Sequence, residues 1–248
     1  MKLKPNKRIG KVLYLVEGDV DEVLILRHIF SDVLHYSVVT YDKRNDNVTY
    51  LFNPNDKYSK AFIVPMKYSA ISKIEDSVGY VEYIYSKLKG YGLEKDECAR
   101  YLIFDRDIGS NSYKKFKSLF KTFKNSLDNN LEINGLLLVS YPCVQSLLCE
   151  CFGDDVNCAT SDSMKCYAKK YDVCDIKEKE LLTGAESMIK TILRILQEQR
   201  FDNSVLDDME EMNCCILSSQ DNYYKQSGAY ITLSLVFLSF VDLGIIEL

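Results

Sequence analysis

Two groups of acidic residues directly follow apolar segments of the chain. Glu17 and Gly18 come after the apolar run of residues 11–16, and Asp21 lies about one helical turn further on. Asp105 and Asp107 follow a second apolar run, residues 100–104. In open parallel sheets, ligand sites form at the carboxyl ends of the strands. We therefore expect these carboxylates to converge at one edge of a sheet, with Gly18 permitting a sharp turn.

Three or four carboxylates without nearby His or Cys are typical of a site for Mg²⁺ or Mn²⁺ rather than zinc. Without a cation they would repel one another. Such a site suits phosphoryl transfer or phosphodiester hydrolysis, with one metal ion or two. The structural alternative is that Glu-Gly and Asp-x-Asp at strand ends only form turns or helix caps.

Apolar strands alternate with helical patterns in the first part of the chain. The apolar pattern predicts strands over residues 11–16, 36–41, 61–66, 100–104 and 133–139, and helices over residues 20–34, 71–89, 113–127 and 144–152. The polar segment 42–60 predicts a hairpin or loop insertion. This alternation favours an α/β fold with a mostly parallel sheet and helices on both faces.

The strand pattern ends near residue 153, and helices are predicted over residues 185–199, 205–217 and 228–243. We therefore predict a catalytic domain over residues 1–152. Residues 153–248 would form a helical extension for substrate recognition, dimerisation or partner docking.

The composition is that of a folded protein, with 248 residues, 47% hydrophobic and 27% charged, and a net charge of -5. The acidic balance argues against coating nucleic acid by charge alone. The longest apolar stretch, residues 229–246, is interrupted by polar side chains and predicts a buried helix rather than a membrane span. Nine cysteines without a secretory signal favour the cytoplasm.

Six of the cysteines lie between residues 143 and 174. Zinc modules usually present ligands in close C-x(2–4)-C pairs, and this spacing is different. We expect free thiols.

Two segments resemble the signature motifs of the TOPRIM domain, V-L-Y-L-V-E-G-D-V-D-E-V-L-I at 12–25 and Y-L-I-F-D-R-D at 101–107. The resemblance covers about residues 11–152 and implies a Rossmann-like TOPRIM fold. It also implies that Glu17 is a metal ligand or general base, that Asp105 and Asp107 are metal ligands, and that Asp21 is a second-site ligand. Gly18 would be there for the conformation of the backbone.

Within this family, the pattern V-E-G-x-x-D is most similar to the OLD, RloB and AriB-type nucleases of phage defence. Residues 139–152 are similar to a RloB-like block with an S-x-P-x-x-E pattern, except that Gln145 replaces its Glu, and Glu150 is a weak substitute. OLD proteins carry an ATPase, but this sequence has no G-x(4)-G-K-[ST] motif. Any ATPase would be a separate subunit, as in PARIS-type systems.

Lysines are candidate substrate contacts in two places. Lys114 and Lys115 belong to a basic helix after the Asp-x-Asp segment, where a solvated helix face is the alternative. Lys165 and Lys169 lie among tyrosines, a combination that suits phosphate and base contacts.

The leading prediction is a Mg²⁺- or Mn²⁺-dependent nuclease that acts on RNA or DNA as the effector of a bacterial anti-phage system. We expect it to form a homodimer. The second hypothesis is a catalytically inactive TOPRIM-like regulatory subunit of an ATPase-containing complex, which Gln145 favours. A third is a small primase-like nucleotidyl-transfer enzyme, which would need a nucleotide site.

Overall fold

The computed structural model describes residues 1–41, 48–66, 93, 98–106, 112–127, 135–198 and 208–248. The chain divides into two compact units. Unit 1 is made of Met1–Pro5, Ile103–Gly109 and Leu138–Leu248, and unit 2 is made of Asn6–Leu102 and Ser110–Leu137.

Unit 2 is built on strands that follow one another closely in the sequence. Its elements are β2 (Lys11–Val16), α1 (Asp21–His28) with a π-helical turn (Ile29–Val33), β3 (Ser37–Tyr41), β4 (Thr49–Asn53), β5 (Asp56–Pro65), α3 (Tyr113–Thr122) and β7 (Lys124–Asn125). Residues 12–16 of β2 are all buried, as expected of a strand that is covered on both faces. β2 pairs in parallel with β5, from Lys11 opposite Lys60 to Val16 opposite Pro65.

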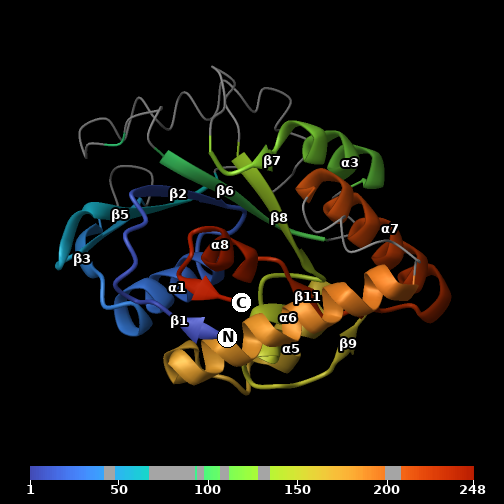
Figure 1. Cartoon of the computed structure of the whole chain (residues 1–248). Coiled ribbons are helices and arrows are strands. Elements are labelled where there is room, and N and C mark those ends of the chain that lie inside the picture. Colours follow the sequence, from blue (N-terminus) through green and yellow to red (C-terminus); the bar gives the residue numbers. More distant parts are fainter. Residues whose placement is uncertain (42–47, 67–92, 94–97, 107–111, 128–134, 199–207) are drawn as a thin grey trace. The chain divides into compact units, whose positions relative to one another are not determined.

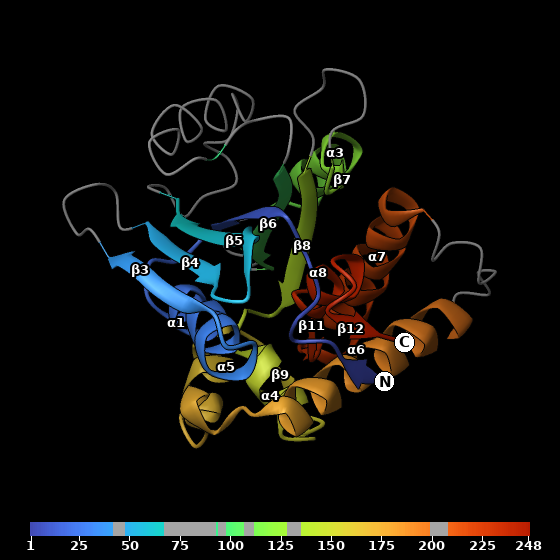
Figure 2. The same ribbon diagram turned by 60° about the vertical axis from the view of Figure 1, so that its left-hand side comes forward.

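Helix α1 covers one face of this sheet. It packs against β4 and β5, and Figure 2 shows β3, β4 and β5 side by side above it. The helix buries Val23, Ile25 and Leu26, whereas Leu24 and Arg27 remain exposed. This one-sided burial is that of an amphipathic helix lying on a sheet.

Unit 1 holds most of the helices. It contains β1 (Lys2–Leu3), α4 (Ser146–Cys151), β9 (Asn157–Cys158), α5 (Ser161–Ala168), a 3₁₀ turn (Val173–Asp175), α6 (Glu178–Glu198), α7 (Met209–Ser227), β10 (Tyr230–Ile231), β11 (Leu233–Ser234), α8 (Phe237–Asp242) and β12 (Ile246–Glu247). The long helix α6 packs against α4, α7 and α8 (Figure 1). Gly184 allows this packing, because a Cβ there would lie 2.3 Å from a ring carbon of Phe237.

Strands β6 (Cys98–Asp105) and β8 (Gly135–Tyr141) contribute residues to both units. The strand order of the eight-stranded sheet is β11-β8-β6-β2-β5-β4-β3, with β7 also paired to β8. The protein is therefore a mixed α/β protein with a mostly parallel central sheet flanked by helices, which is compatible with a Rossmann-like fold. The predicted fold class is confirmed at this level.

Several predicted elements differ from the structure. The prediction that strands end near residue 153 is wrong, because β9 to β12 follow it and β11 pairs with β8. The predicted helix 228–243 is reduced to α8, since β10 and β11 occupy its first part. The predicted helix 113–127 ends at Thr122, where β7 begins to pair with β8. The predicted helix 71–89 lies outside the described residues.

Among the described residues, no helix is both long enough and apolar enough to cross a membrane.

Candidate functional site

The first acidic group lies in unit 2, between β2 and α1. Glu17 directly follows the last residue of β2 and is half-buried, and Asp21 is the exposed first residue of α1. The positive end of the helix dipole favours negative charge in this first turn. We call Glu17, Gly18, Asp21 and Glu22 the acidic turn.

Glu22 is the member of the acidic turn that sequence reasoning missed. It is only 6% exposed. A Cβ built on Gly18 would lie 2.1 Å from Glu22 Oε2, so the Glu22 carboxylate occupies the space that a side chain at position 18 would need. Gly18 does not have a positive φ, and the close approach of Glu22 therefore explains the glycine better than backbone freedom does.

Asp105 belongs to unit 1, as the last residue of β6. Its side chain is buried, and Oδ1 accepts a hydrogen bond of 2.8 Å from the backbone N–H of Val144, just ahead of α4. This bond fixes the carboxylate to the segment between β8 and α4. Its position at the carboxyl end of a strand is the one that the sequence predicts.

Arg106 points to a different partner. Its guanidinium is buried and binds Asp221 of α7 in a bidentate manner, with Nε–Oδ1 and Nη2–Oδ2 distances of 3.0 and 2.7 Å. Burial lowers the pKa of Arg106, but the hydrogen bonds and charge attraction of Asp221, together with the neighbouring Tyr230 and Tyr141, raise it overall. Arg106 therefore stays charged, and its bonds to Asp221 anchor the end of β6 to α7.

The convergence of the acidic residues stays a prediction. Glu17 and Asp21 belong to unit 2 and Asp105 to unit 1, and Asp107 lies outside the described residues. Within the described part of the chain, no three His, Cys, Asp or Glu side chains form a group that could hold a metal ion. The carboxylate oxygens of the described acids nevertheless have the chemistry that Mg²⁺ and Mn²⁺ require.

The two predicted lysine groups have different surroundings. Lys114 and Lys115 lie on α3 of unit 2, where Lys114 is exposed and Lys115 is half-buried. Lys165 and Lys169 are exposed at α5 of unit 1. The tyrosines near them are already engaged, because Tyr167 and Tyr171 both donate hydrogen bonds to Asp154.

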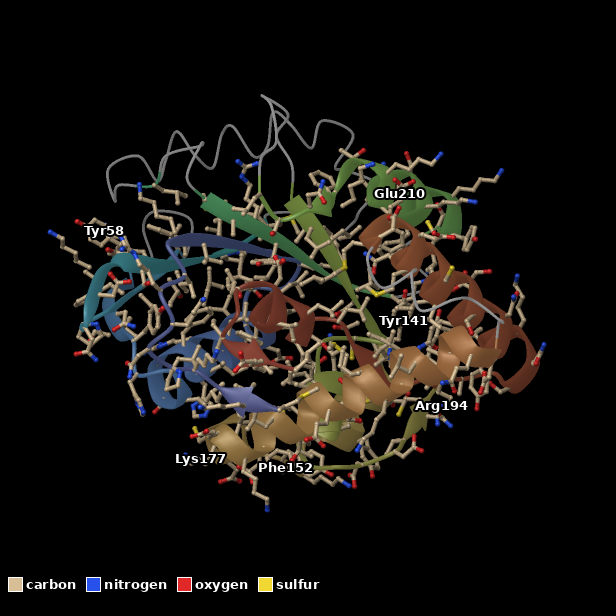
Figure 3. All side chains as sticks on the ribbon, viewed as in Figure 1. Tyr58, Tyr141, Phe152, Lys177, Arg194 and Glu210 are labelled. Carbon is tan, nitrogen blue, oxygen red and sulfur yellow. The ribbon has the colours of Figure 1, made fainter. Side chains whose placement is uncertain are left out.

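A basic groove in unit 2 escaped the sequence analysis. Its lining residues are Arg8, Gly10, Lys11, Lys57, Tyr58 and Lys60, and its volume is about 570 Å³. Tyr58, labelled in Figure 3, is 53% exposed, and the Arg8 guanidinium lies 4.3 Å from its ring centroid. Lys11 and Lys60 pair at the start of β2, so the groove lies roughly 20 Å along that strand from Glu17.

Four of the six cysteines between residues 143 and 174 are buried, and the other two are exposed. Cys143, Cys149 and Cys158 form an apolar cluster with Met164, and all nine cysteines are free thiols, as predicted. Burial raises the pKa of Cys149 to about 12. This thiol is protonated at neutral pH and is therefore a weak nucleophile.

Known proteins do not identify the chain. No family model, curated protein or solved structure matches it. The case for a function therefore rests on the residues themselves.

Proposed function

We propose that this protein is a cytoplasmic metal-dependent nuclease with a TOPRIM-type fold, acting as the effector of a bacterial anti-phage system. The observation that carries the proposal is the acidic turn at the carboxyl end of β2, with Glu17 half-buried and Asp21 exposed. Asp105 at the carboxyl end of β6 supports it.

The metal ligands in this proposal are Glu17, Asp21, Asp105 and Asp107. Their oxygen donors fit a hard cation, and Asp105 stands at the carboxyl end of β6. Bound Mg²⁺ or Mn²⁺ would supply charge neutralisation for the phosphate and activation of the attacking water.

The side chains have separate tasks in hydrolysis. Glu17 accepts a proton from the water whose oxygen attacks phosphorus, while the P–O bond to the leaving oxygen breaks and that oxygen is protonated from solvent. Glu22, buried against Gly18, positions the turn and does not contact the substrate. The Val144 N–H holds Asp105 in place.

The basic groove is the proposed contact for backbone phosphates. Arg8, Lys11, Lys57 and Lys60 would bind the phosphates, and exposed Tyr58 would stack on a base. At roughly 3.4 Å per nucleotide, about six nucleotides span the strand from Lys11 to Glu17. Lys114, Lys115, Lys165 and Lys169 remain further proposed contacts. A homodimer and a separate ATPase subunit are proposed partners.

A cleavage assay tests this function. Purified protein is incubated with labelled DNA and total RNA in Mg²⁺ or Mn²⁺, beside Glu17→Gln and Asp105→Asn. Asp162→Asn is the matched control, because Asp162 is an exposed acid in the first turn of α5 as Asp21 is in α1.

We expect cleavage by the wild type and the control, and none by Glu17→Gln or Asp105→Asn. Equal cleavage by all four proteins would contradict the assignment of the site. Absence of cleavage with intact Mn²⁺ binding would indicate a missing activating partner. Absence of Mn²⁺ binding would favour the regulatory subunit, in keeping with Gln145 in the place of a Glu.

A further inference from the structure

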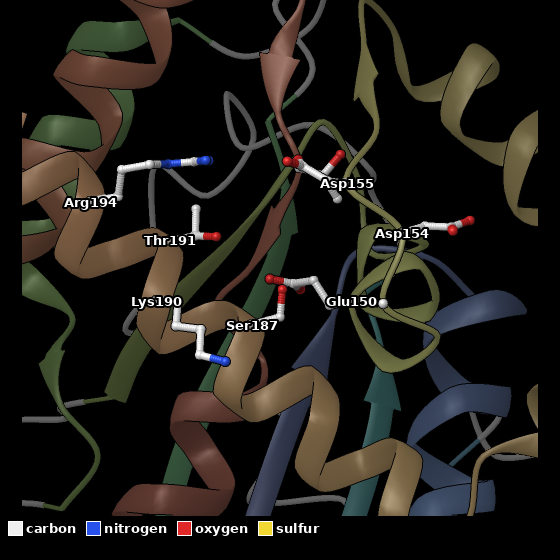
Figure 4. Close-up of a pocket in the computed structure, with 9 residues that line it drawn as sticks. Glu150, Asp154, Asp155, Ser187, Lys190, Thr191 and Arg194 are labelled. Atoms are coloured by element: carbon white, nitrogen blue, oxygen red, sulfur yellow. The ribbon is translucent and has the colours of Figure 1, made fainter.

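Unit 1 contains a polar pocket that the proposed nuclease chemistry does not use. It has a volume of about 240 Å³ and is lined by Glu150, Gly153, Asp154, Asp155, Ser187, Lys190, Thr191, Arg194 and Thr232. Figure 4 shows Lys190, Thr191 and Arg194 along α6, with Glu150 and Asp155 across from them. All lining residues belong to unit 1.

Glu150 forms the buried end of the pocket. Its side chain is only 2% exposed, and Oε2 accepts a 2.9 Å hydrogen bond from the backbone N–H of Ser234. Oε1 has no hydrogen-bond partner among the described residues. Figure 4 shows the carboxyl group turned toward α6. A buried polar atom without a partner is costly, and a ligand in the pocket would satisfy it.

Burial also decides the charge of this group. Loss of hydration raises the pKa of Glu150 well above its ordinary value of 4.5, and the bond from Ser234 only partly opposes this. Burial therefore favours the neutral form of this carboxyl group. Because Oε2 accepts from Ser234, a proton on Oε1 could be donated to a ligand in the pocket.

Helix α6 adds positive charge on the opposite side. Arg194 is exposed, and its guanidinium has no ion-pair or hydrogen-bond partner in the described part of the chain. The Lys190 Nζ atom lies 3.7 Å from Glu186 Oε2. This exposed ion pair is weak, and the ammonium group of Lys190 can donate to a ligand as well. Ser187 and Thr191, on the same helix, add hydroxyl groups to the lining of the pocket.

The two aspartates of the pocket differ in availability. Asp154 is held by Lys170 at 2.6 Å and by hydrogen bonds from Tyr167 and Tyr171. Asp155 is exposed at the rim. The interior of the pocket therefore presents mainly donors, and one acceptor stands at its entrance.

We propose that this pocket binds a small phosphate monoester, with Arg194 and Lys190 on the phosphate oxygens and the Glu150 hydroxyl donating to the same group. A phosphate has three terminal oxygens for these donors, whereas a carboxylate has two. The pocket is smaller than the roughly 300–1,000 Å³ of sites for drug-sized ligands, so the organic part is small. Asp155 would accept hydrogen bonds from hydroxyl or amino groups on the organic part of the ligand. The proposal is independent of nuclease activity.

Isothermal titration calorimetry at pH 7 without divalent cations tests the proposal. The probes are inorganic phosphate, glycerol 3-phosphate and acetate. The proteins are the wild type, Arg194→Gln, Glu150→Gln and Lys179→Gln. Lys179 provides a matched control, because it is exposed on α6 and does not line the pocket.

We expect both phosphates to bind the wild type and Lys179→Gln, and Arg194→Gln to weaken them by about tenfold, the effect of losing a charge-assisted contact. Glu150→Gln, whose amide still donates, should bind within about threefold of the wild type. Acetate should bind at least about tenfold more weakly than phosphate.

Two results would overturn the proposal. One is the absence of phosphate binding to the wild type, and the other is equal phosphate affinity in the wild type and Arg194→Gln. Acetate binding as tightly as phosphate would refute the choice of ligand. Arg194 is exposed, so its replacement leaves the folded state intact for this comparison.

Discussion

The acidic turn and the Glu150 pocket place carboxyl groups in opposite environments. Glu17 and Asp21 lie at a strand end where water reaches them, whereas Glu150 is nearly completely buried. Hydration favours the ionised form of a carboxyl group, which can bind a cation, whereas desolvation without a cationic partner favours the neutral form, which can donate a hydrogen bond. The comparison teaches that burial and the partners of an acid together decide which chemistry it can perform.

The largest expected effect is a difference in cleavage rate between a variant of the acidic turn and a variant of the Glu150 pocket. Glu17→Gln should reduce cleavage by roughly 10²- to 10⁴-fold, since it removes a general base, while Glu150→Gln should leave the rate within about twofold. Initial rates on the substrate identified in the cleavage assay measure both. Similar losses in the two variants would erase the proposed distinction between them.

The buried ion pair of Arg106 and Asp221 provides the contrast to Glu150. Asp221→Ala removes the bidentate partner of the buried Arg106 guanidinium and should lower the free energy of unfolding by about 3–5 kcal/mol. Urea denaturation measures the loss. Adding Arg106→Leu should recover part of it, and a double variant less stable than Asp221→Ala would contradict this explanation.

The protonation of Glu150 predicts a pH-dependent difference in stability. Since its folded-state pKa is raised, its contribution to stability is present below about pH 4.5 and is lost as the pH rises toward the folded-state pKa. Glu150→Gln lacks this dependence. The stability of the variant relative to wild type should therefore increase with pH by up to about 1.4 kcal/mol per unit above pH 4.5.

Urea denaturation at pH 5, 6 and 7 measures this difference. A constant difference across the three pH values would show that Glu150 titrates normally in the folded protein.

The smallest expected effect concerns Gly18. Gly18→Ala should lower the free energy of unfolding by about 1 kcal/mol, because the new Cβ displaces the buried Glu22 carboxylate from its contacts. In a Glu22→Ala background the same substitution should cost almost nothing. If Gly18→Ala lowers the free energy of unfolding equally in that background, the loss comes from the backbone of the turn and not from contact with Glu22.

Local patterns were sufficient to predict much of the sheet. The apolar runs at residues 11–16, 61–66 and 100–104 overlap β2, β5 and β6, because a strand buried on both faces is continuously apolar. The strand ends, and with them the places of Glu17 and Asp105, follow from the same runs.

Contacts between distant segments could not be predicted in this way. β11 is two residues long and exists through its pairing with β8, and Arg106 meets Asp221 from 115 positions away. The hydrogen bond from Ser234 to Glu150 likewise joins residues 84 positions apart. No local period encodes such pairings, since they arise only when the chain has folded.

Mn²⁺ binding measured by electron paramagnetic resonance tests the central claim most directly. The account predicts that the wild type and Glu150→Gln bind Mn²⁺ with equal affinity, and that Glu17→Gln weakens binding by at least about tenfold. Unchanged binding by Glu17→Gln, or loss of binding in Glu150→Gln alone, would contradict the assignment of the cation to the acidic turn.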